Sequence, residues 1–185
     1  EKQFIQYAGW PIPVTTAVDA AVDLYPSERK VVAKVQISWQ NKSSQPIEKV
    51  LVNWPENTEQ LSIRIDGANL SERDNKLRTS WLSFTPAIAP GQTISGEIEL
   101  VRQVVGIRET GFDPSVVENG TFINNRALLP SFGYQDGYEL QDRHERQKRG
   151  LQPNERANKL EDSRFYRQNF FGQDGDFIQF AATIS

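Results

Sequence analysis

The residues best suited to chemistry in this sequence are few and scattered. His144 and Glu145 open the pattern of a zinc-binding helix, in which a second histidine four residues later binds the metal and the glutamate acts as a base. The residue four positions after His144 is Lys148, and the 185 residues contain one histidine and no cysteine. Because a protonated lysine is not a zinc ligand, we interpret this segment as a solvated charged surface.

Two pairs of acidic residues are candidates for an acid and a base, namely Glu97 with Glu99 and Asp174 with Asp176. The first pair falls on the polar side of an alternating strand. The second pair falls in a glycine-flanked turn that lacks the spacing of a calcium loop. We therefore predict surface and turn roles for both pairs, and an independent glycosidase that uses paired carboxylates stays as an alternative.

Tryptophan side chains raise a second kind of site, since sugars stack on flat aromatic faces. Trp39 lies on the apolar side of its strand and Trp54 precedes Pro55, so structural positions are predicted for both. The four tryptophans are Trp10, Trp39, Trp54 and Trp81.

Asn-x-Ser/Thr triplets carry little information because they arise by chance. The three triplets begin at Asn41, Asn69 and Asn119.

Composition narrows the classes of function. The formal net charge is −3, and the 21 basic residues are dispersed except for residues 143–149. That cluster is flanked by acidic residues and lacks aromatic ones, so no nucleic-acid partner is predicted, although phosphate, an acidic partner or lipid headgroups remain alternatives to a solvated face. The absence of cysteine leaves the compartment open. The sequence lacks the roughly 18 consecutive apolar residues of a membrane helix, and its first ten residues are not a signal peptide.

Residues 16–104 alternate apolar and polar residues with a period of two, which is typical of half-buried β-strands. Turn signals separate these segments, among them Pro26, Asp66-Gly67 and Pro90-Gly91. Several short strands with turns between them predict an all-β fold, an antiparallel β-sandwich. The clearest apolar face, within residues 31–40, comprises Val31, Ala33, Val35, Ile37 and Trp39.

The chain is expected to form one domain, residues 1–185, with a loop and short-helix excursion around residues 106–175. Within the excursion, Asn154 is a candidate N-cap for a helix from Glu155 to Asp162. The apolar residues 177–184 are expected to return to the sheet as a final strand. Because the sequence opens within a pattern and closes on an apolar run, we expect both ends to belong to a longer polypeptide.

One segment resembles a known family. It runs from Val116-Val117-Glu118-Asn119-Gly120-Thr121-Phe122 through Arg126 to Pro130-Ser131-Phe132-Gly133-Tyr134. This order is similar to the end of the N-terminal β-domain of the aminopeptidase N metallopeptidases. It is most similar to a divergent bacterial branch in which a peptidase-like region is joined to an ABC-transporter-type permease.

The resemblance implies a saddle-like sandwich that docks on a thermolysin-like catalytic domain. It places the zinc in that missing domain, so this chain is expected to hold no cofactor and no catalytic residue. In the soluble members, a Gln or Glu near the positions of Glu118 and Asn119 holds the substrate's free amine, and Arg126 matches a basic residue before the proline. Asn119-Gly120-Thr121 departs from that pattern, so a tight turn is the alternative to substrate contact.

The function implied by the resemblance is that of a non-catalytic, extracytoplasmic (periplasmic) β-domain of a membrane-anchored, zinc-aminopeptidase-like protein. Its partners are then the catalytic peptidase domain of the same polypeptide and a peptide N-terminus, with membrane contact through the parent protein only. The long charged segment, residues 135–171, is expected to serve an interface of this branch. The alternative is a stand-alone β-sandwich module that binds glycan or protein.

Overall fold

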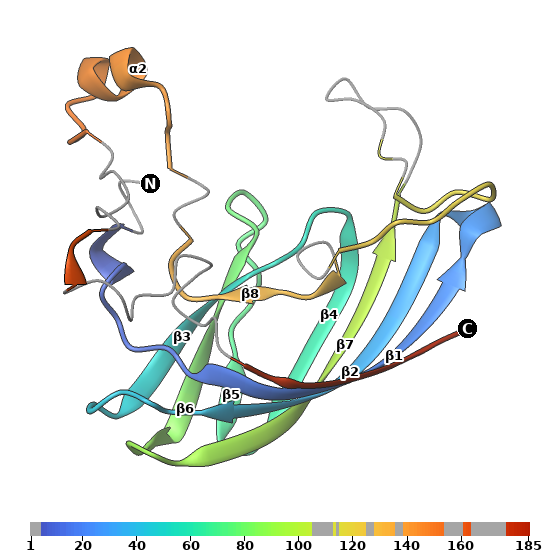
Figure 1. The fold of residues 1–185 in the computed structure, drawn as a ribbon, viewed down its shortest axis with the longest axis horizontal. Coiled ribbons are helices and arrows are strands. Elements are labelled where there is room, and N and C mark those ends of the chain that lie inside the picture. Colours follow the sequence, from blue (N-terminus) through green and yellow to red (C-terminus); the bar gives the residue numbers. More distant parts are fainter. Residues whose placement is uncertain are drawn as a thin grey trace.

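The computed structural model describes residues 5–104, 113, 115–124, 128–135, 139–153, 161–163 and 177–185. Over these residues the chain is a two-sheet β-sandwich with one short α-helix (Figure 1), so the predicted all-β sandwich is confirmed. The elements in chain order are the 3-10 helix Ile5–Tyr7, β1 (Val14–Tyr25), the 3-10 helix Pro26–Glu28, β2 (Lys30–Gln40), β3 (Ile47–Asn53), β4 (Thr58–Ile65), β5 (Ala68–Leu70), β6 (Thr79–Ile88), β7 (Thr93–Gln103), β8 (Ser131–Phe132), α2 (Arg143–Lys148) and β9 (Gln179–Ile184).

The larger sheet has five strands in the order β4-β7-β2-β1-β9. Its first four strands pair antiparallel, and β9 pairs parallel with β1. The predicted final strand therefore exists and returns to the sheet, starting two residues later than expected. This parallel pairing departs from the otherwise antiparallel sandwich, and it was not predicted because sequence alternation does not reveal strand direction.

The smaller sheet has four strands in the order β5-β6-β3-β8. Its strands also pair antiparallel, and the short β8 pairs with the end of β3 through Val52 with Phe132 and Asn53 with Ser131. The core lies between the two sheets and takes residues from both. Trp39 of β2 and Phe132 of β8 meet there with ring centroids 4.5 Å apart and planes at 78°.

The apolar residues of the alternating pattern within residues 31–40 form the buried face of β2. All five predicted apolar residues are at most 5% exposed. Val18, Ala20 and Val22 of β1 and Ile98 and Leu100 of β7 are buried in the same layer, as period-two alternation requires.

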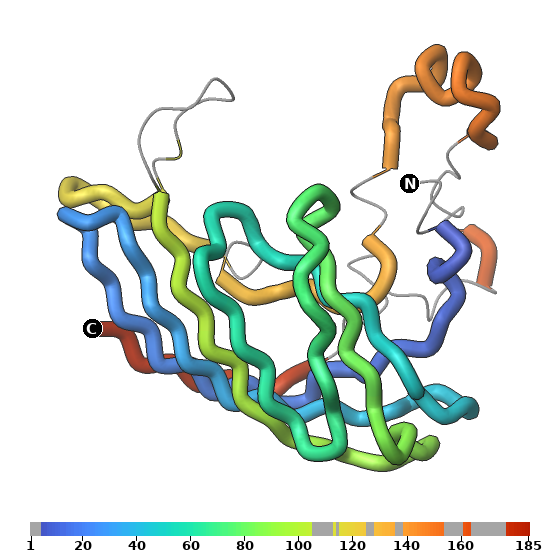
Figure 2. Tube along the Cα trace, turned by 180° about the vertical axis from the view of Figure 1, so that it is seen from behind, coloured from blue at the N-terminus to red at the C-terminus, as the bar shows by residue number. Residues whose placement is uncertain are grey.

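The excursion contains the described helix α2, which lies at residues 143–148 and not at residues 155–162. Asp142 caps it, since its side-chain Oδ1 accepts a hydrogen bond from the Glu145 N–H at 2.8 Å. The expected cap Asn154 and most of its helix lie outside the described residues. In Figure 2 the N-terminal segment and α2 gather at one end of the curved strands, and the C-terminus lies at the other.

Candidate functional site

The predicted substrate-proximal residues Glu118 and Asn119 occupy an exposed turn. The Gly120 N–H donates to the Val117 carbonyl at 3.2 Å, which closes the turn with Glu118 and Asn119 at its two central positions. Both side chains are exposed, as is Gly120. The alternative of a turn at this sequence is thus realised, and it leaves the Glu118 carboxylate in solvent. Arg126 lies outside the described residues.

This turn belongs to a segment, residues 115–124, that we call the Glu118 loop. The Phe122 N–H donates to the Ser115 carbonyl at 2.9 Å and closes the loop on itself. Val116 is fully buried in the core, whereas Phe122 is 78% exposed. In Figures 1 and 2 the loop, drawn in yellow, lies beside the β1–β2 connection at the end of the sheets opposite α2.

A buried arginine fixes the start of this loop. Arg102 ends the inner face of β7 and is 3% exposed. Its Nη2 lies 2.6 Å from Asp113 Oδ2, and its Nη1 donates to Ser115 Oγ at 3.0 Å. Burial raises the pKa of Asp113, but hydrogen bonds from Ser115 and the charge of Arg102 outweigh burial, so its pKa lies below the ordinary value. The loop is therefore held to the sandwich by an ion pair at its start and by Val116 in the core.

Sequence reasoning missed this pair of residues. A signal was present, because Arg102 continues the inner-face series after Ile98 and Leu100, where an arginine must find an acceptor if the strand stays buried. The identity of that acceptor, Asp113, follows only from the folded structure, which places its carboxylate beside Arg102.

The second half of the resembling segment is structural. Phe132 is buried against Trp39, and Gly133 joins β8 to β3 by donating its N–H to the Leu51 carbonyl at 2.8 Å. The Asn53 side-chain amide donates to the Gly133 carbonyl at 2.9 Å. Residues 130–134 therefore complete the smaller sheet and shape the path of the chain.

The carboxylates of Glu97 and Glu99 form a cross-strand ion network. Lys34 Nζ lies 3.0 Å from Glu97 Oε2 and 3.4 Å from Glu99 Oε1, and Arg64 bridges the same two carboxylates from β4. Hydrogen bonds from Arg64 and then Lys34 lower the pKa of Glu97 to about 2. A glutamate held ionised in this way is a poor proton donor near neutral pH, so the geometry does not favour the glycosidase alternative.

The basic run is a largely solvated surface, as predicted, and it lies on the unpredicted helix α2. His144 is exposed, and Glu145 pairs with Lys148 at 2.8 Å and with Arg149. Arg146 is the exception, because it is 6% exposed and donates from Nη1 to the Leu140 carbonyl at 2.7 Å. Among the described residues, no group of three or more His, Cys, Asp or Glu side chains is placed to hold a metal, and no helix is long and apolar enough to cross a membrane.

The tryptophans divide into two groups. Trp39 is 1% exposed and lies in the core as predicted, and Trp54, for which a structural position was predicted, is 9% exposed and also packs in the core. Trp10 is 41% exposed and forms a cluster with Tyr7 and Trp81, in which the Tyr7 centroid lies 4.8 Å from Trp10 and 4.9 Å from Trp81. In this cluster beside the smaller sheet Trp10 is exposed, whereas Tyr7 and Trp81 are half-buried.

The triplet asparagine Asn41 has a structural position. It is fully buried, and its side-chain Nδ2 donates to the carbonyls of Gln45 and Ile88 at 2.8 and 2.9 Å. In the folded domain this side chain is therefore closed to modification, whereas Asn69 and Asn119 are exposed.

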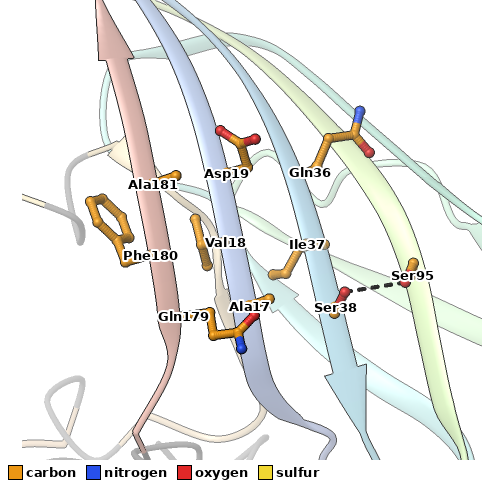
Figure 3. A pocket seen from close by; sticks show the side chains of 10 residues that line it. All are labelled: Ala17, Val18, Asp19, Gln36, Ile37, Ser38, Ser95, Gln179, Phe180 and Ala181. Carbon is orange, nitrogen blue, oxygen red and sulfur yellow. Dashed lines mark hydrogen bonds between the residues drawn. The ribbon is translucent and has the colours of Figure 1, made fainter.

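A shallow depression of about 440 Å³ lies where β9, β1, β2 and β7 run side by side (Figure 3). Small side chains, Ala17 and Ala181, leave the space, and the Ser38 and Ser95 hydroxyls meet across it at 3.2 Å. Asp19 is the one ionisable residue in its lining, so it does not bring an acid and a base together. The lining residues are Ala17, Val18, Asp19, Gln36, Ile37, Ser38, Ser95, Gln179, Phe180 and Ala181.

Fold and loop together define a β-sandwich domain that presents an anchored, exposed acidic turn. No known protein family and no curated protein matches the sequence. Among solved structures, it is similar to a mutant M1 zinc metallopeptidase from Deinococcus radiodurans, with 10% identity and a TM-score of 0.40, over 49% of this chain and 20% of that chain. It is also similar to a two-domain M1 zinc metallopeptidase bound to L-tryptophan, with 10% identity and a TM-score of 0.41, over 57% of this chain and 23% of that chain.

Proposed function

We propose that this chain is a non-catalytic β-domain of a zinc-aminopeptidase-like protein and covers one side of a peptide cleft formed by a separate catalytic domain. The observation that carries the proposal is the Glu118 turn, an exposed carboxylate on a loop anchored by Arg102 and Val116. A fixed anion at the rim of a cleft attracts the ammonium group of a peptide N-terminus. The sandwich behind it limits the length of peptide that fits.

The proposal includes the setting of the parent protein. The domain is extracytoplasmic and belongs to a membrane-anchored protein with an ABC-transporter-type permease region, as the sequence resemblance implies. The zinc belongs to the catalytic domain, which supplies the hydrolytic step. Reading the parent gene tests this setting, since a downstream His-Glu-x-x-His and several apolar runs of about 20 residues are expected.

The non-catalytic role is tested on the chain itself. The purified chain, incubated with zinc and an aminoacyl reporter substrate, is expected to release no product. Zinc-dependent turnover that follows the protein through purification would refute the role.

The role of Glu118 is tested in the parent protein with Glu118→Gln. Loss of a charged hydrogen-bond partner costs about 1.5–3 kcal/mol, so kcat/KM for peptides with a free amine is expected to fall roughly 10-fold or more. The exposed Glu72 provides a matched control as Glu72→Gln, which is expected to change nothing. An unchanged kcat/KM in Glu118→Gln would remove the residue from the substrate site.

A second candidate, a glycan-binding module, is favoured by the partly exposed cluster of Tyr7, Trp10 and Trp81. Titration with oligosaccharides, followed by tryptophan fluorescence, is expected to show binding that Trp10→Ala abolishes if this function holds. Tyr25→Ala is the control, since Tyr25 is equally exposed, at 40% against 41%, and lies outside the cluster. Absence of any fluorescence change across a broad set of glycans would dispose of this candidate.

A further inference from the structure

Strand β9 forms one edge of the larger sheet, and half of its backbone groups have no hydrogen-bond partner in the part of the chain that the structure describes. The Ser185 N–H donates to the Val22 carbonyl at 3.0 Å, and the Ser185 carbonyl accepts from the Leu24 N–H at 2.9 Å. In a parallel ladder this pattern repeats at every second residue. The N–H and C=O groups of Phe180, Ala182 and Ile184 therefore point away from β1, toward the open edge.

The side chains of the same three residues form an apolar row. Phe180, Ala182 and Ile184 lie opposite Val18, Ala20 and Val22 of β1, so they continue the inner face of the sheet. The three β1 residues are buried, whereas Phe180 is 57% and Ile184 is 67% exposed. The edge thus combines free hydrogen-bonding groups with uncovered apolar side chains.

This edge lacks the features that keep sheet edges apart. Natural edge strands carry charges, prolines or bulges that prevent pairing with another strand. The opposite edge of the sheet, β4, carries Glu59 and Arg64, but β9 has the sequence Gln-Phe-Ala-Ala-Thr-Ile, with no charge and no proline. Every residue of β9 is exposed although the strand is fully formed.

We propose that β9 pairs with β9 of a second copy of this chain, antiparallel and two-fold symmetric about Ala182. This register sets Phe180 opposite Ile184 of the other copy and Ala182 opposite itself. Both are pairs of residues whose free groups point outward, so each pair exchanges two backbone hydrogen bonds. The register also keeps the apolar row on one side of the joined sheets and places Ala181 opposite Thr183 on the other.

The charge and size of this edge set the strength of the dimer. Since β9 carries no charge, no like charges meet directly across the two-fold axis. The strand is only about 20 Å long, so the contact is smaller than the roughly 800 Å² per partner of a standard interface. The dimer is therefore weak, with dissociation in or above the micromolar range.

Sedimentation equilibrium over a concentration series from low micromolar to several hundred micromolar tests this inference. The mean mass is expected to rise from the 21.0 kDa of one chain toward twice that value and then to level off, because a two-fold contact closes. Ala182→Pro removes an outward N–H and is expected to give a monomer with the fold retained. Ala181→Pro is the contrasting variant, since it removes an N–H that bonds to β1 and is expected to lower the unfolding temperature.

A pair of lysine variants separates the apolar row from the strand as a whole. Phe180→Lys places a charge in the row and is expected to abolish the dimer, whereas Thr183→Lys adds the same charge on the other face and is expected to preserve it. A wild-type chain that stays monomeric throughout the series, a dimer that survives both Ala182→Pro and Phe180→Lys, or open-ended growth beyond the dimer would each overturn the inference. These outcomes are independent of the function proposed above.

Discussion

Gly133 illustrates how a single residue is constrained by both its backbone and its surroundings. Its φ is +77°, a left-handed conformation that costs other residues about 1–2 kcal/mol. A Cβ added there would lie 2.8 Å from Cγ2 of Ile12, which is too close for a normal contact. Glycine is therefore required at the join between β8 and the segment that follows it.

Gly133→Ala is expected to lower the free energy of unfolding by about 2–4 kcal/mol, since the backbone cost and overpacking add. Gly91→Ala is the matched control, because Gly91 has a φ of +78° with open space around it and is expected to cost only about 1–2 kcal/mol. Urea denaturation measures both. Equal losses would mean that Ile12 moves aside at no cost.

Glu97 makes the stability of the folded state depend on pH in a way that a single substitution can measure. Its pKa is lowered in the folded state from 4.5 to about 2, so the folded state favours the ionised form. The resulting stability is fully present above the unfolded pKa and is lost as pH falls from about 4.5 to about 2. Glu97→Gln is therefore expected to be less stable than the wild type at neutral pH, with a difference that shrinks as pH approaches 2.

Denaturation curves for wild type and Glu97→Gln at descending pH measure this difference. Glu48→Gln serves as the control, because Glu48 is exposed on β3 and makes no ion pair among the described residues. The difference in the free energy of unfolding between Glu48→Gln and wild type is expected to stay constant across the same pH range. If the difference between Glu97→Gln and wild type is equally constant, the lowered pKa of Glu97 in the folded state is contradicted.

At the scale of elements, the Arg102–Asp113 pair connects β7 to the Glu118 loop. Removing one partner of a buried pair costs about 3–5 kcal/mol when the other charge stays buried. The Asp113 side chain is 31% exposed, so water partly compensates, and about 2–3 kcal/mol is expected for Arg102→Met. The same substitution is expected to speed hydrogen exchange at residues 115–122 more than in β2.

A double-mutant cycle with Asp113→Asn tests the coupling of these two residues. If the pair acts as a unit, the double variant loses less free energy of unfolding than the two single variants lose in sum. Additive losses would show that the loop is held by Val116 and its own hydrogen bonds instead.

At the scale of the whole molecule, Trp39 and Phe132 join the two sheets across the core. Phe132→Ala removes an aromatic ring from a buried site and is expected to cost about 3–5 kcal/mol, whereas Phe132→Leu nearly conserves volume and is expected to cost under about 1.5 kcal/mol. Thermal or urea unfolding measures the two losses. A small loss in Phe132→Ala would show that β8 is not needed to hold the sheets together.

Much of the sandwich is readable from the sequence because its determinants are local. Alternation within residues 31–40 predicted which side of β2 is buried, since successive side chains of a strand point to opposite faces. Trp39 was assigned to the core on the same grounds, whereas Trp54 was given a structural position because it precedes Pro55. The turn at Asn119-Gly120 also follows from short-range backbone preferences.

Tertiary structure alone decided how distant segments meet. The direction of β9, the partner of Arg102, the contact between Ile12 and Gly133, and the network joining Lys34 and Arg64 to Glu97 each depend on segments far apart in the chain. Composition and periodicity carry no information about such pairings, because strand order is selected by the packing of the complete fold. The sequence by itself therefore determined the class of fold and which faces of its alternating strands are buried, while the anchoring of the Glu118 loop and the edge position of β9 arose only from the folded chain.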